Sequence, residues 1–572
     1  MPELNFKGKE FVYNHHLSVP YCPLVPNAKK SIGDADLSGN LIIHGDNLVA
    51  LKTLLPHYAG KVDVIYIDPP YNTGNESWRY NDNVNSPMMR EWLASNPVNK
   101  DDLLRHDKWL ALMYPRLRLL HELLAEHGVI LVSIDDNEFH HLRGVMNEVF
   151  REVNWVGTIV WKNVTDNNPT NISTEHEYVV CYAKNKELLP KEWKSSVSDT
   201  KERLIALGKE LTLKHSEQAD LQRAYTKWLS EQKPFIWPFQ DYKFIDKDGI
   251  YTGSRSVHNP GKEGYRYPVI HPKTGKPCKE PMMGYRFPLE TMKQLLVDRK
   301  VLFGSDHNKI IELKVYVQEF EDKLPSVITL DVRAGANELR AMFPEKTKVF
   351  DNPKPRRLLV DLLSFVTRPD SMVLDSFAGS GTTAHAVLEL NKRDGGQRRF
   401  ILVECEDYAD DLTAERVRRA IKGVPGSKDD DVKKGVGGSF TYYTLGEPID
   451  IDKLLTGERL PQYEALGAWL FHTATGEALK PEAIDESKWF LGESPGFYVW
   501  LVYKPILDFL KSRDAALTLE LAERIAKMRD AKGTNKRHLV FAPAKYVPNK
   551  MLLPLGVEHA PLPFALYRIE KS

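Results

Sequence analysis

The residues with the clearest chemical potential in this 572-residue chain are Asp68, Pro69, Pro70 and Tyr71, which directly follow the apolar run VDVIYI. The two prolines fix φ and lack an N–H group, so the segment presents mainly hydrogen-bond acceptors at the end of a strand. A carboxylate and a carbonyl can accept both N–H groups of an exocyclic amine and turn its lone pair toward an electrophile, while the aromatic ring can stack on a base. The same residues could instead form a turn that only ends the strand.

A second segment, FAGSGTT at residues 377–383, has the pattern of a nucleotide-binding loop. The strand-like run MVLDSFA leads into it and TTAHAVLEL begins a helix, so backbone N–H groups and a positive helix end would face a ligand. Gly381 is followed by Thr382 and not by Lys, which argues against a phosphate-binding P-loop. Glu404 ends the run FILVE roughly 20 positions further on, where an acid could hold ribose hydroxyls. Taken alone, the loop fits NAD, S-adenosylmethionine, or a tight turn without a ligand.

Together these segments resemble those of a known enzyme family. IDPPYNTG, LDSFAGSGTT and the upstream LIIHGDN are similar to motifs of the DNA amino-methyltransferases, in the permuted β subgroup whose DPPY element precedes the cofactor loop. The chain most resembles the modification (Mod) subunits of Type III restriction-modification systems, because FDNPKP (350–355) and HPKTGKPCKEPMMGYRF (271–287) also look like Mod segments. The resemblance extends over residues 39–422.

The resemblance implies an α/β, Rossmann-like methyltransferase fold and methyl transfer from S-adenosylmethionine to N6 of an adenine flipped out of double-stranded DNA. Asp68, Pro69, Pro70 and Tyr71 would form the amine site. The cofactor pocket would be lined by Asp375, Phe377, Gly379, Gly381 and Thr382, with Glu404 on the ribose and Lys354 in the motif that closes over the cofactor. Asp46 of HGDN would shape the pocket near the target base. The family also implies a homodimer and a separate ATP-dependent restriction (Res) subunit.

Three other functions compete with this interpretation. N4-cytosine methylation uses the same amine chemistry, although that branch of the family usually has Ser in place of Asp68. An NAD-dependent oxidoreductase would explain the glycine loop but neither DPPY nor the basic segment described next. A catalytically silent DNA-binding subunit would not need both motifs intact.

A basic, aromatic-rich segment lies between the two motifs. Residues 251–300 hold ten Lys and Arg against four Asp and Glu, in a chain whose Lys plus Arg and Asp plus Glu both total 78. Basic side chains neutralise phosphates and read guanine edges, and aromatic rings stack on bases. A merely solvated charged face would give the same composition. The candidate DNA contacts are Arg255, Lys262, Arg266, Lys273, Lys276 and Arg286, interleaved with Tyr251, Tyr265, Tyr267, Tyr285 and Phe287.

Strand and helix patterns divide the chain around these motifs. A polar arm (1–38) precedes a catalytic half (39–183) in which apolar strands alternate with helices near 109–126 and 139–150, which predicts a mostly parallel sheet. A target-recognition module (184–343) interrupts this alternation, and a cofactor-binding half (344–422) restores it. A linker (423–438) leads to an α+β tail (439–572), where FYVWLVYKPILDFL could pack against a partner or in the tail's own core.

Composition excludes several other classes of protein. Four well-separated cysteines argue against a disulfide framework, and the N-terminus and apolar runs show neither a signal pattern nor a membrane span, so we expect a soluble cytoplasmic protein. The adjacent pairs His15/His16 and His140/His141 lack the spacing of metalloprotease ligands, and we expect no metal. Ser133 and Ser376 lack a nucleophile-elbow setting, which argues against hydrolysis.

Overall fold

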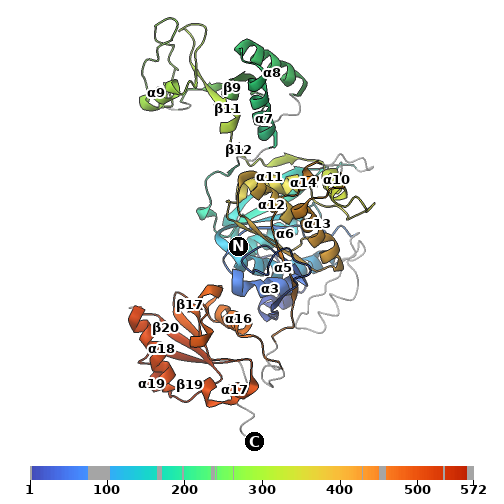
Figure 1. The fold of residues 1–572 in the computed structure, drawn as a ribbon, viewed down its shortest axis with the longest axis vertical. Helices are drawn as coiled ribbons and strands as arrows, with labels where there is room; N and C mark the ends of the chain where they lie inside the picture. Colours follow the sequence, from blue (N-terminus) through green and yellow to red (C-terminus); the bar gives the residue numbers. More distant parts are fainter. Residues whose placement is uncertain are drawn as a thin grey trace. The chain divides into compact units, whose positions relative to one another are not determined.

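The computed structural model describes residues 3–74, 104–163, 171–195, 199–232, 239, 241–259, 261, 263–427, 430–449, 459–532 and 535–562. The chain forms two compact units, residues 192–324 and the remainder, with the first inserted between two parts of the second (Figure 1). Each unit is described by itself below. In the described part of the chain, no helix is long and apolar enough to cross a membrane.

The larger unit is built on one ten-stranded sheet. The six strands from β16 to β4 in sheet order are mutually parallel, β6 runs against β4, and β1 runs against β16. The central strands are buried on both faces, as an α/β sheet requires. The order is β1 (Leu24–Pro26), β16 (Thr441–Leu445), β2 (Leu41–His44), β15 (Arg399–Glu404), β14 (Met372–Asp375), β3 (Val62–Ile67), β4 (Leu124–Ile134), β6 (His176–Ala183), β5 (Trp155–Lys162) and β13 (Val327–Thr329).

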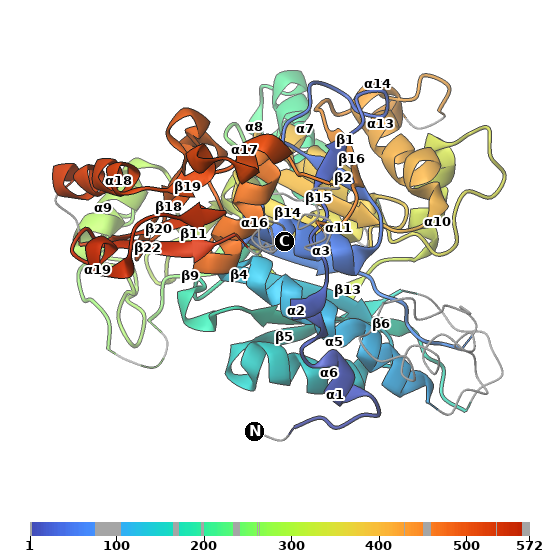
Figure 2. The ribbon, with the colours of Figure 1, turned by 90° about the horizontal axis from the view of Figure 1, so that it is seen from below.

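Helices cover both faces of this sheet, which confirms the predicted α/β class. Helices α3 (Asn47–Tyr58) and α5 (Arg105–Leu123) pack together, and so do α11 (Arg356–Val366) and α12 (Thr382–Asp394). The two pairs lie on opposite sides of the strands, with α13 (Glu415–Lys422) beside α12 (Figure 1, Figure 2). Two further helices of this unit are α10 (Arg333–Met342) and α14 (Asp430–Lys434). The expected helix at 109–126 thus ends at Leu123, and the one at 139–150 is α6 (Phe139–Met146) followed by a π-turn at Asn147–Arg151.

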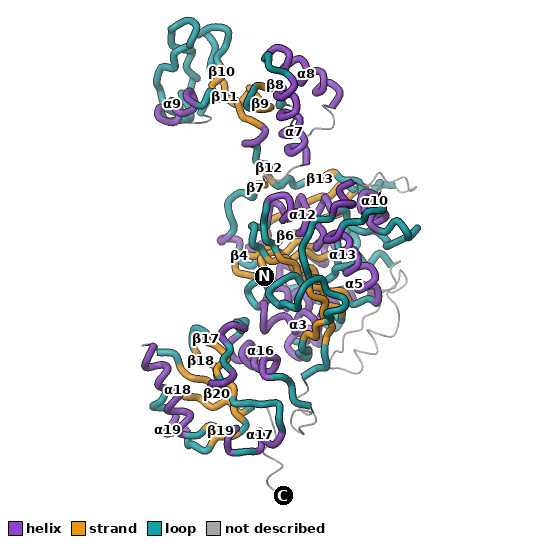
Figure 3. Tube along the Cα trace, viewed as in Figure 1, coloured by secondary structure: helices purple, strands orange, loops and turns teal. Residues whose placement is uncertain are grey.

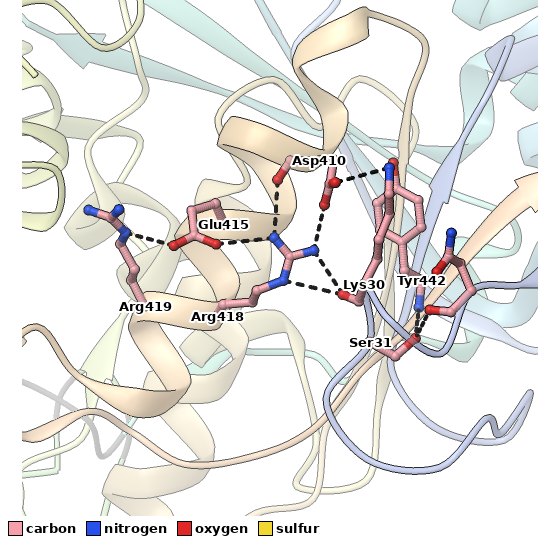
Figure 4. Close-up of polar contacts among 8 residues, drawn as sticks. Lys30, Ser31, Asp410, Glu415, Arg418, Arg419 and Tyr442 are labelled. Atoms are coloured by element: carbon pink, nitrogen blue, oxygen red, sulfur yellow. Dashed lines mark hydrogen bonds and ion pairs between the residues drawn. The ribbon is translucent and has the colours of Figure 1, made fainter.

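The N-terminal segment is part of this sheet and not a separate arm. It contains α1 (Lys9–Val12), α2 (His15–Ser18) and β1, whose Val25 pairs with Thr444 of β16. Side chains hold the segment as well: Lys30 Nζ lies 2.9 Å from Asp410 Oδ2 and 5.1 Å from the centre of the Tyr442 ring. Arg418 of α13 donates to the same aspartate and to the Lys30 carbonyl (Figure 4). The polar composition of residues 1–38 concealed this role, because a short edge strand needs little apolar sequence.

The expected end of the inserted module and the expected end of the catalytic domain also change, because short strands were not predicted from the sequence. β13 pairs with β5 in parallel from Val327, so the inserted unit ends at residue 324 and not at 343. β16 pairs with β2, so residues 441–445 complete the sheet although they lie beyond the linker expected at 423–438. Short strands at the edge of a sheet, such as β13, or next to it, such as β16, carry weak sequence signals, because few residues make the pattern.

The inserted unit has its own sheet and two apolar clusters. Strands lie in the order β10 (Val301–Leu302), β11 (Glu312–Tyr316), β9 (Gly249–Ser256) and β8 (Phe244–Asp246), all antiparallel. β7 (Lys194–Ser195) and β12 (Asp322–Lys323) pair where the chain enters and leaves the unit. The helices are α7 (Asp199–Lys214), α8 (Gln218–Gln232) and α9 (Leu289–Val297).

The C-terminal residues form another small layered domain (Figure 3). Its sheet runs β17 (Phe490–Glu493), β18 (Phe497–Leu501), β20 (Arg537–Ala542), β22 (Val557–Pro561), and the last three strands are parallel with helices between them, so this part is α/β and not α+β. Tyr498, Val499, Leu501, Val502 and Tyr503 are fully buried, so most of FYVWLVYKP packs in the domain's own core. The other elements are α16 (Tyr463–Thr475), α17 (Leu507–Lys511), β19 (Ala516–Leu517), α18 (Leu519–Lys532), β21 (Ala544–Lys545) and α19 (Asn549–Leu552).

Candidate active site

The two motifs meet at the middle of the large sheet. β3 and β14 are neighbouring parallel strands, and the chain leaves them toward opposite edges of the sheet. Such a reversal of strand order opens a crevice at the carboxyl ends of the strands. Asp68 follows β3 and Asp375 ends β14, while Glu404 ends the next strand, β15. The topology therefore brings the predicted amine site and the cofactor loop together at the carboxyl ends of the central strands.

The DPPY segment is held by contacts on both sides. Trp109 Nε1 of α5 donates to the Pro70 carbonyl over 2.7 Å, which uses one of the acceptors that the prolines expose. The Tyr71 hydroxyl donates to Glu177 Oε2 over 2.8 Å. Burial, together with the negative charges of Asp68 and Glu177, raises the pKa of Tyr71 well above its usual value, so its hydroxyl stays a donor.

The side chain of Lys354 lies in the amine site, next to Asp68, whereas the sequence motif suggests only a place near the cofactor. Its ammonium is 3.0 Å from Asp68 Oδ1 and 3.4 Å from Glu177 Oε2, and it lies 4.7 Å from the centre of the Tyr71 ring. Burial lowers the pKa of Lys354, but the two carboxylates outweigh burial and raise it overall. The backbone carbonyl of the same residue accepts a hydrogen bond from Thr382 Oγ1 of the glycine loop, 3.3 Å away.

The glycine loop has the geometry that its sequence predicts. Gly379 and Gly381 both have positive φ, 50° and 77°, and α12 begins directly after them. A Cβ on Gly381 would lie 2.9 Å from the Thr413 carbonyl, so only glycine fits there. The buried Arg416 of α13 donates to Ser380 Oγ over 2.9 Å and to Thr382 Oγ1 over 2.6 Å. The first N–H groups of α12 thus lie in a loop that is fixed from behind.

Two acids of the cofactor side support the loop through hydrogen bonds. Asp375 accepts from the Phe377 N–H (3.0 Å) and from Thr383 Oγ1 (2.5 Å), and burial is the main cause that raises its pKa to about 7. Glu404 accepts from the N–H of Gly379 (2.7 Å) and from the N–H groups of the two residues that follow it. The contact of Glu404 with a ribose stays a prediction. Its hydrogen bond from the Gly379 N–H also helps to hold the glycine loop in place. Phe377 is partly exposed.

Asp46 caps a helix at the adjoining strand end. Its carboxylate accepts from the Val49 N–H over 3.0 Å at the start of α3, which is the ordinary role of an aspartate before a helix. The neighbouring Asn47 accepts from the buried Arg116 Nε over 2.6 Å and donates to the Ser376 carbonyl over 3.3 Å. The HGDN motif therefore connects β2 to the end of β14.

A buried carboxylate that sequence reasoning missed, Glu138, holds the end of the DPPYN segment. Asn72 is buried with φ of 58°, and its amide donates to Glu138 Oε1. His106 Nδ1 lies 2.6 Å from the same oxygen and His141 Nδ1 lies 2.8 Å from Oε2. The bond to Glu138 is the main cause that raises the pKa of His141. His140 and His141 are adjacent in the sequence, but the histidine that lies against His141 is His106 of α5, with ring centres 4.8 Å apart.

His106, Glu138 and His141 are also the described residues best placed to hold a metal ion. In the described residues, the ligand atoms of His106, Glu138 and His141 lie within 4.8 Å of one another. Two histidines and one glutamate are a known zinc ligand set. Both carboxylate oxygens of Glu138 are, however, already within hydrogen-bond distance of a ring nitrogen, so the hydrogen-bond network accounts for the cluster.

The expected DNA contacts are divided between surface and core. Lys273, Lys276 and Arg286 are exposed, and Arg266 is half exposed beside Glu263 and Glu280. Lys262 lies outside the described residues, as does the side chain of Arg255. Of the interleaved aromatic residues, Tyr267 and Tyr285 stack on each other in the core of the inserted unit, with ring centres 4.7 Å apart, so they are not available to stack on bases. Tyr265 is exposed.

Comparison with known proteins agrees with this geometry. The family model described as a DNA methylase matches residues 62–415, a range that spans both motifs and the inserted unit. The chain belongs to the DNA methylase family.

The methylase is similar to several Type III enzymes. It shares 50% identity with the Mod subunit of the Type III restriction-modification enzyme EcoP15I from Escherichia coli, over 67% of this chain and 63% of that subunit. Identity to the StyLTI Mod subunit of Salmonella typhimurium is 31%, over 70% and 58% of the two chains. Identity to the EcoPI Mod subunit of Escherichia phage P1 is also 31%, over 75% and 70%. The chain thus spans less than two thirds of the first two relatives.

Proposed function

We propose that this chain methylates N6 of adenine in double-stranded DNA with S-adenosylmethionine as the methyl donor. The observation that carries the proposal is the placement of Asp68 and the glycine loop on neighbouring parallel strands, β3 and β14, at one edge of the sheet. One motif offers acceptors for an amine, and the other offers helix-end N–H groups for a nucleoside-type ligand. The family and the Mod relatives support the same pairing.

The chain's own residues would share the work as follows. The loop from Phe377 to Thr382 and the Glu404 carboxylate would hold the cofactor, which supplies the methyl group. Asp68 and the Pro69 carbonyl would accept the two N–H groups of the target amine, so that the nitrogen lone pair faces the methyl group and the developing positive charge is stabilised. Tyr71 would stack on the flipped base, and its hydroxyl bond to Glu177 fixes the orientation of its ring.

The inserted unit is the proposed reader of the DNA sequence. Its exposed Lys273, Lys276 and Arg286 fit phosphate or base-edge contacts, and it folds on its own core, as a module that carries specificity requires. Assembly as a homodimer with a Res subunit is part of the same proposal, and it follows from the resemblance to Mod subunits of Type III enzymes.

N4-cytosine is the second candidate target, because the same acceptors suit its amine. Expression of the chain in a host without DNA methylation, followed by long-read mapping of modified bases, separates the two. We expect N6-methyladenine within one sequence motif. N4-methylcytosine would replace the adenine assignment, and an unmodified genome would contradict methyl transfer.

A further inference from the structure

The centre of the candidate amine site contains a cation that belongs to the protein. The Lys354 ammonium lies between the carboxylates of Asp68 and Glu177, with the ring of Tyr71 at 4.7 Å and that of Trp161 at 5.8 Å. The side chain of Lys354 is only 11% exposed. Two carboxylates and two aromatic faces make a site for a positively charged nitrogen that carries N–H donors.

The same description fits the target amine during methyl transfer. As the nitrogen attacks the methyl group it becomes positively charged while it still carries N–H donors, and a carboxylate and an aromatic ring stabilise it. A lysine ammonium is therefore a close chemical stand-in for that nitrogen. The ammonium approaches Asp68 Oδ1, and the Asp68 carboxylate is one of the two groups proposed to accept the target N–H groups.

We propose that the Lys354 ammonium occupies the amine site in the DNA-free protein, and that Glu177 receives it when the target base enters. This inference rests on the proposed function. Lys354 keeps Asp68 paired while the site is empty, and the incoming amine displaces the ammonium from Asp68 toward Glu177. Glu177 is suited to receive it, because Asn163 Nδ2 (2.6 Å) and the Tyr71 hydroxyl (2.8 Å) already fix both of its oxygens.

The backbone of Lys354 links the amine site to the cofactor loop. Its carbonyl accepts from Thr382 Oγ1, and Arg416 donates to the same hydroxyl. The segment that carries the ammonium is thus attached to the loop that would hold the cofactor. Lys354 and Glu177 act here as positioning residues, because they act through Asp68 and the loop and not on the methyl group.

The test uses two variants with opposite expected effects on base flipping. Lys354→Met removes the competing cation and keeps the length of the side chain, so a flipped base should be held more strongly. Glu177→Gln keeps a partner for the Tyr71 hydroxyl but leaves Asp68 as the sole carboxylate for the ammonium, so flipping should weaken. A 2-aminopurine placed beside the mapped target adenine, which itself keeps its N6 amine, reports flipping of that adenine by a change in fluorescence, and we expect the flipping equilibrium to change about fivefold or more in each direction.

A pH profile adds a second readout. In Lys354→Met two partly buried carboxylates face each other without a counter-charge, so one takes up a proton more readily and the acid limb of kcat should move to higher pH. The double variant Lys354→Met/Glu177→Gln removes one of the two charges and should move the limb back. Among the described residues, the ionisable groups that interact with Asp68 or Glu177 include Tyr66, Tyr71, Asp135 and Asp375, and they are unchanged in all variants.

Lys348→Met is the matched control, since Lys348 lies in the same segment but pairs with Asp351 on the surface. Flipping reduced by both site variants would show that the cage only supports the fold and would overturn the inference. So would unchanged flipping with weakened cofactor binding. If Lys354→Met does not fold, as judged by circular dichroism, Lys354→Gln takes its place as the variant without the ammonium, and it should likewise strengthen flipping. Failure of the proposed function is separate, because it would appear in the wild-type protein as an unmethylated adenine.

Discussion

At the scale of single residues, the chemistry depends on Asp68. Replacing it by Ala removes the acceptor that turns the amine and stabilises its charge, so methyl transfer should fall by at least about 10²-fold. Binding of S-adenosylmethionine, measured by calorimetry, should change little. Asp370→Ala is a suitable control, because that carboxylate is 83% exposed. Near wild-type turnover in the Asp68 variant would contradict the mechanism.

Glu138 should matter through Asn72 and not through contact with the substrate. In Glu138→Gln the amide cannot accept from Asn72, His106 and His141 as the carboxylate does, so the end of the DPPYN segment shifts. Misplacement of a reacting group by about 1 Å can cost about 10²-fold in rate, and we expect kcat to fall by about 10- to 10²-fold. Kinetics with DNA in excess measures this loss.

The control for that variant is the cofactor affinity, which should stay unchanged. A lower melting temperature with normal kcat would show that the network only stabilises the fold. Addition of Zn²⁺ to the wild-type protein provides a further check: tight binding that His141→Asn abolishes would assign the cluster to a metal.

At the scale of elements, the two ends of α12 allow a matched comparison. Gly381 precedes this helix with φ of 77° and Gly395 follows it with φ of 73°, so Ala costs similar backbone strain at either end. A Cβ on Gly381 meets the Thr413 carbonyl at 2.9 Å, whereas a Cβ on Gly395 meets nothing within 4 Å. Gly381→Ala should therefore weaken cofactor binding by about tenfold or more, since about 1.4 kcal/mol of added crowding corresponds to tenfold.

Calorimetry with S-adenosylmethionine measures the difference between these two variants. Gly395→Ala should lower the melting temperature without changing the dissociation constant. Equal losses of affinity in both variants would show that the loop is not the cofactor site.

The inserted unit should contribute the salt dependence of DNA binding. Replacing Lys273, Lys276 and Arg286 by Gln should lower the slope of log affinity against log salt by about 0.9 for each phosphate contact that is lost. The control replaces Lys214 and Lys293, which form ion pairs with glutamates on their own helices in the same unit. Fluorescence anisotropy over a salt series measures the slope, and an unchanged slope would place the DNA surface elsewhere.

The sequence predicts the elements with strong patterns and misses those with weak ones. The runs VDVIYI, GVILVSI and FILVE are long enough to show buried parallel strands, and DPPY and FAGSGTT follow their strands as expected. Strands β1 and β13 have only three residues, and β16 reads TYYTL without a continuous apolar run. All three lie far in sequence from their partners, so only the fold reveals them. Glu177 and Glu138 were missed because their roles depend on residues that are distant in the chain.

At the scale of the whole molecule, two truncations separate the sheet from the C-terminal domain. A chain that ends at Gly438 lacks β16, so β1 and β2 lose a partner and the protein should be unstable or aggregate. A chain that ends at Ile449 keeps β16 and should retain cofactor binding and methylation. Light scattering then shows whether the domain carries subunit contacts: the mass of one shortened chain, where the full-length protein has the mass of two chains, would assign dimerisation to the domain.

The mass of two shortened chains, with normal capture of a Res subunit, would exclude the C-terminal domain from assembly. An inactive, unfolded chain ending at Ile449 would show that the domain is needed for folding of the catalytic unit.

The position of β2 also determines when the protein can fold during synthesis. β2 leaves the ribosome long before its neighbours β15 and β16, which begin at residues 399 and 441. Translation at about 5–20 residues per second separates β2 from these partners by on the order of 20–70 s. Through that interval an apolar strand has both edges open, while β3, α5 and β4 can already fold as a local unit. The catalytic sheet therefore closes only after β16 has been made, and its apolar strands are open to chaperones until then.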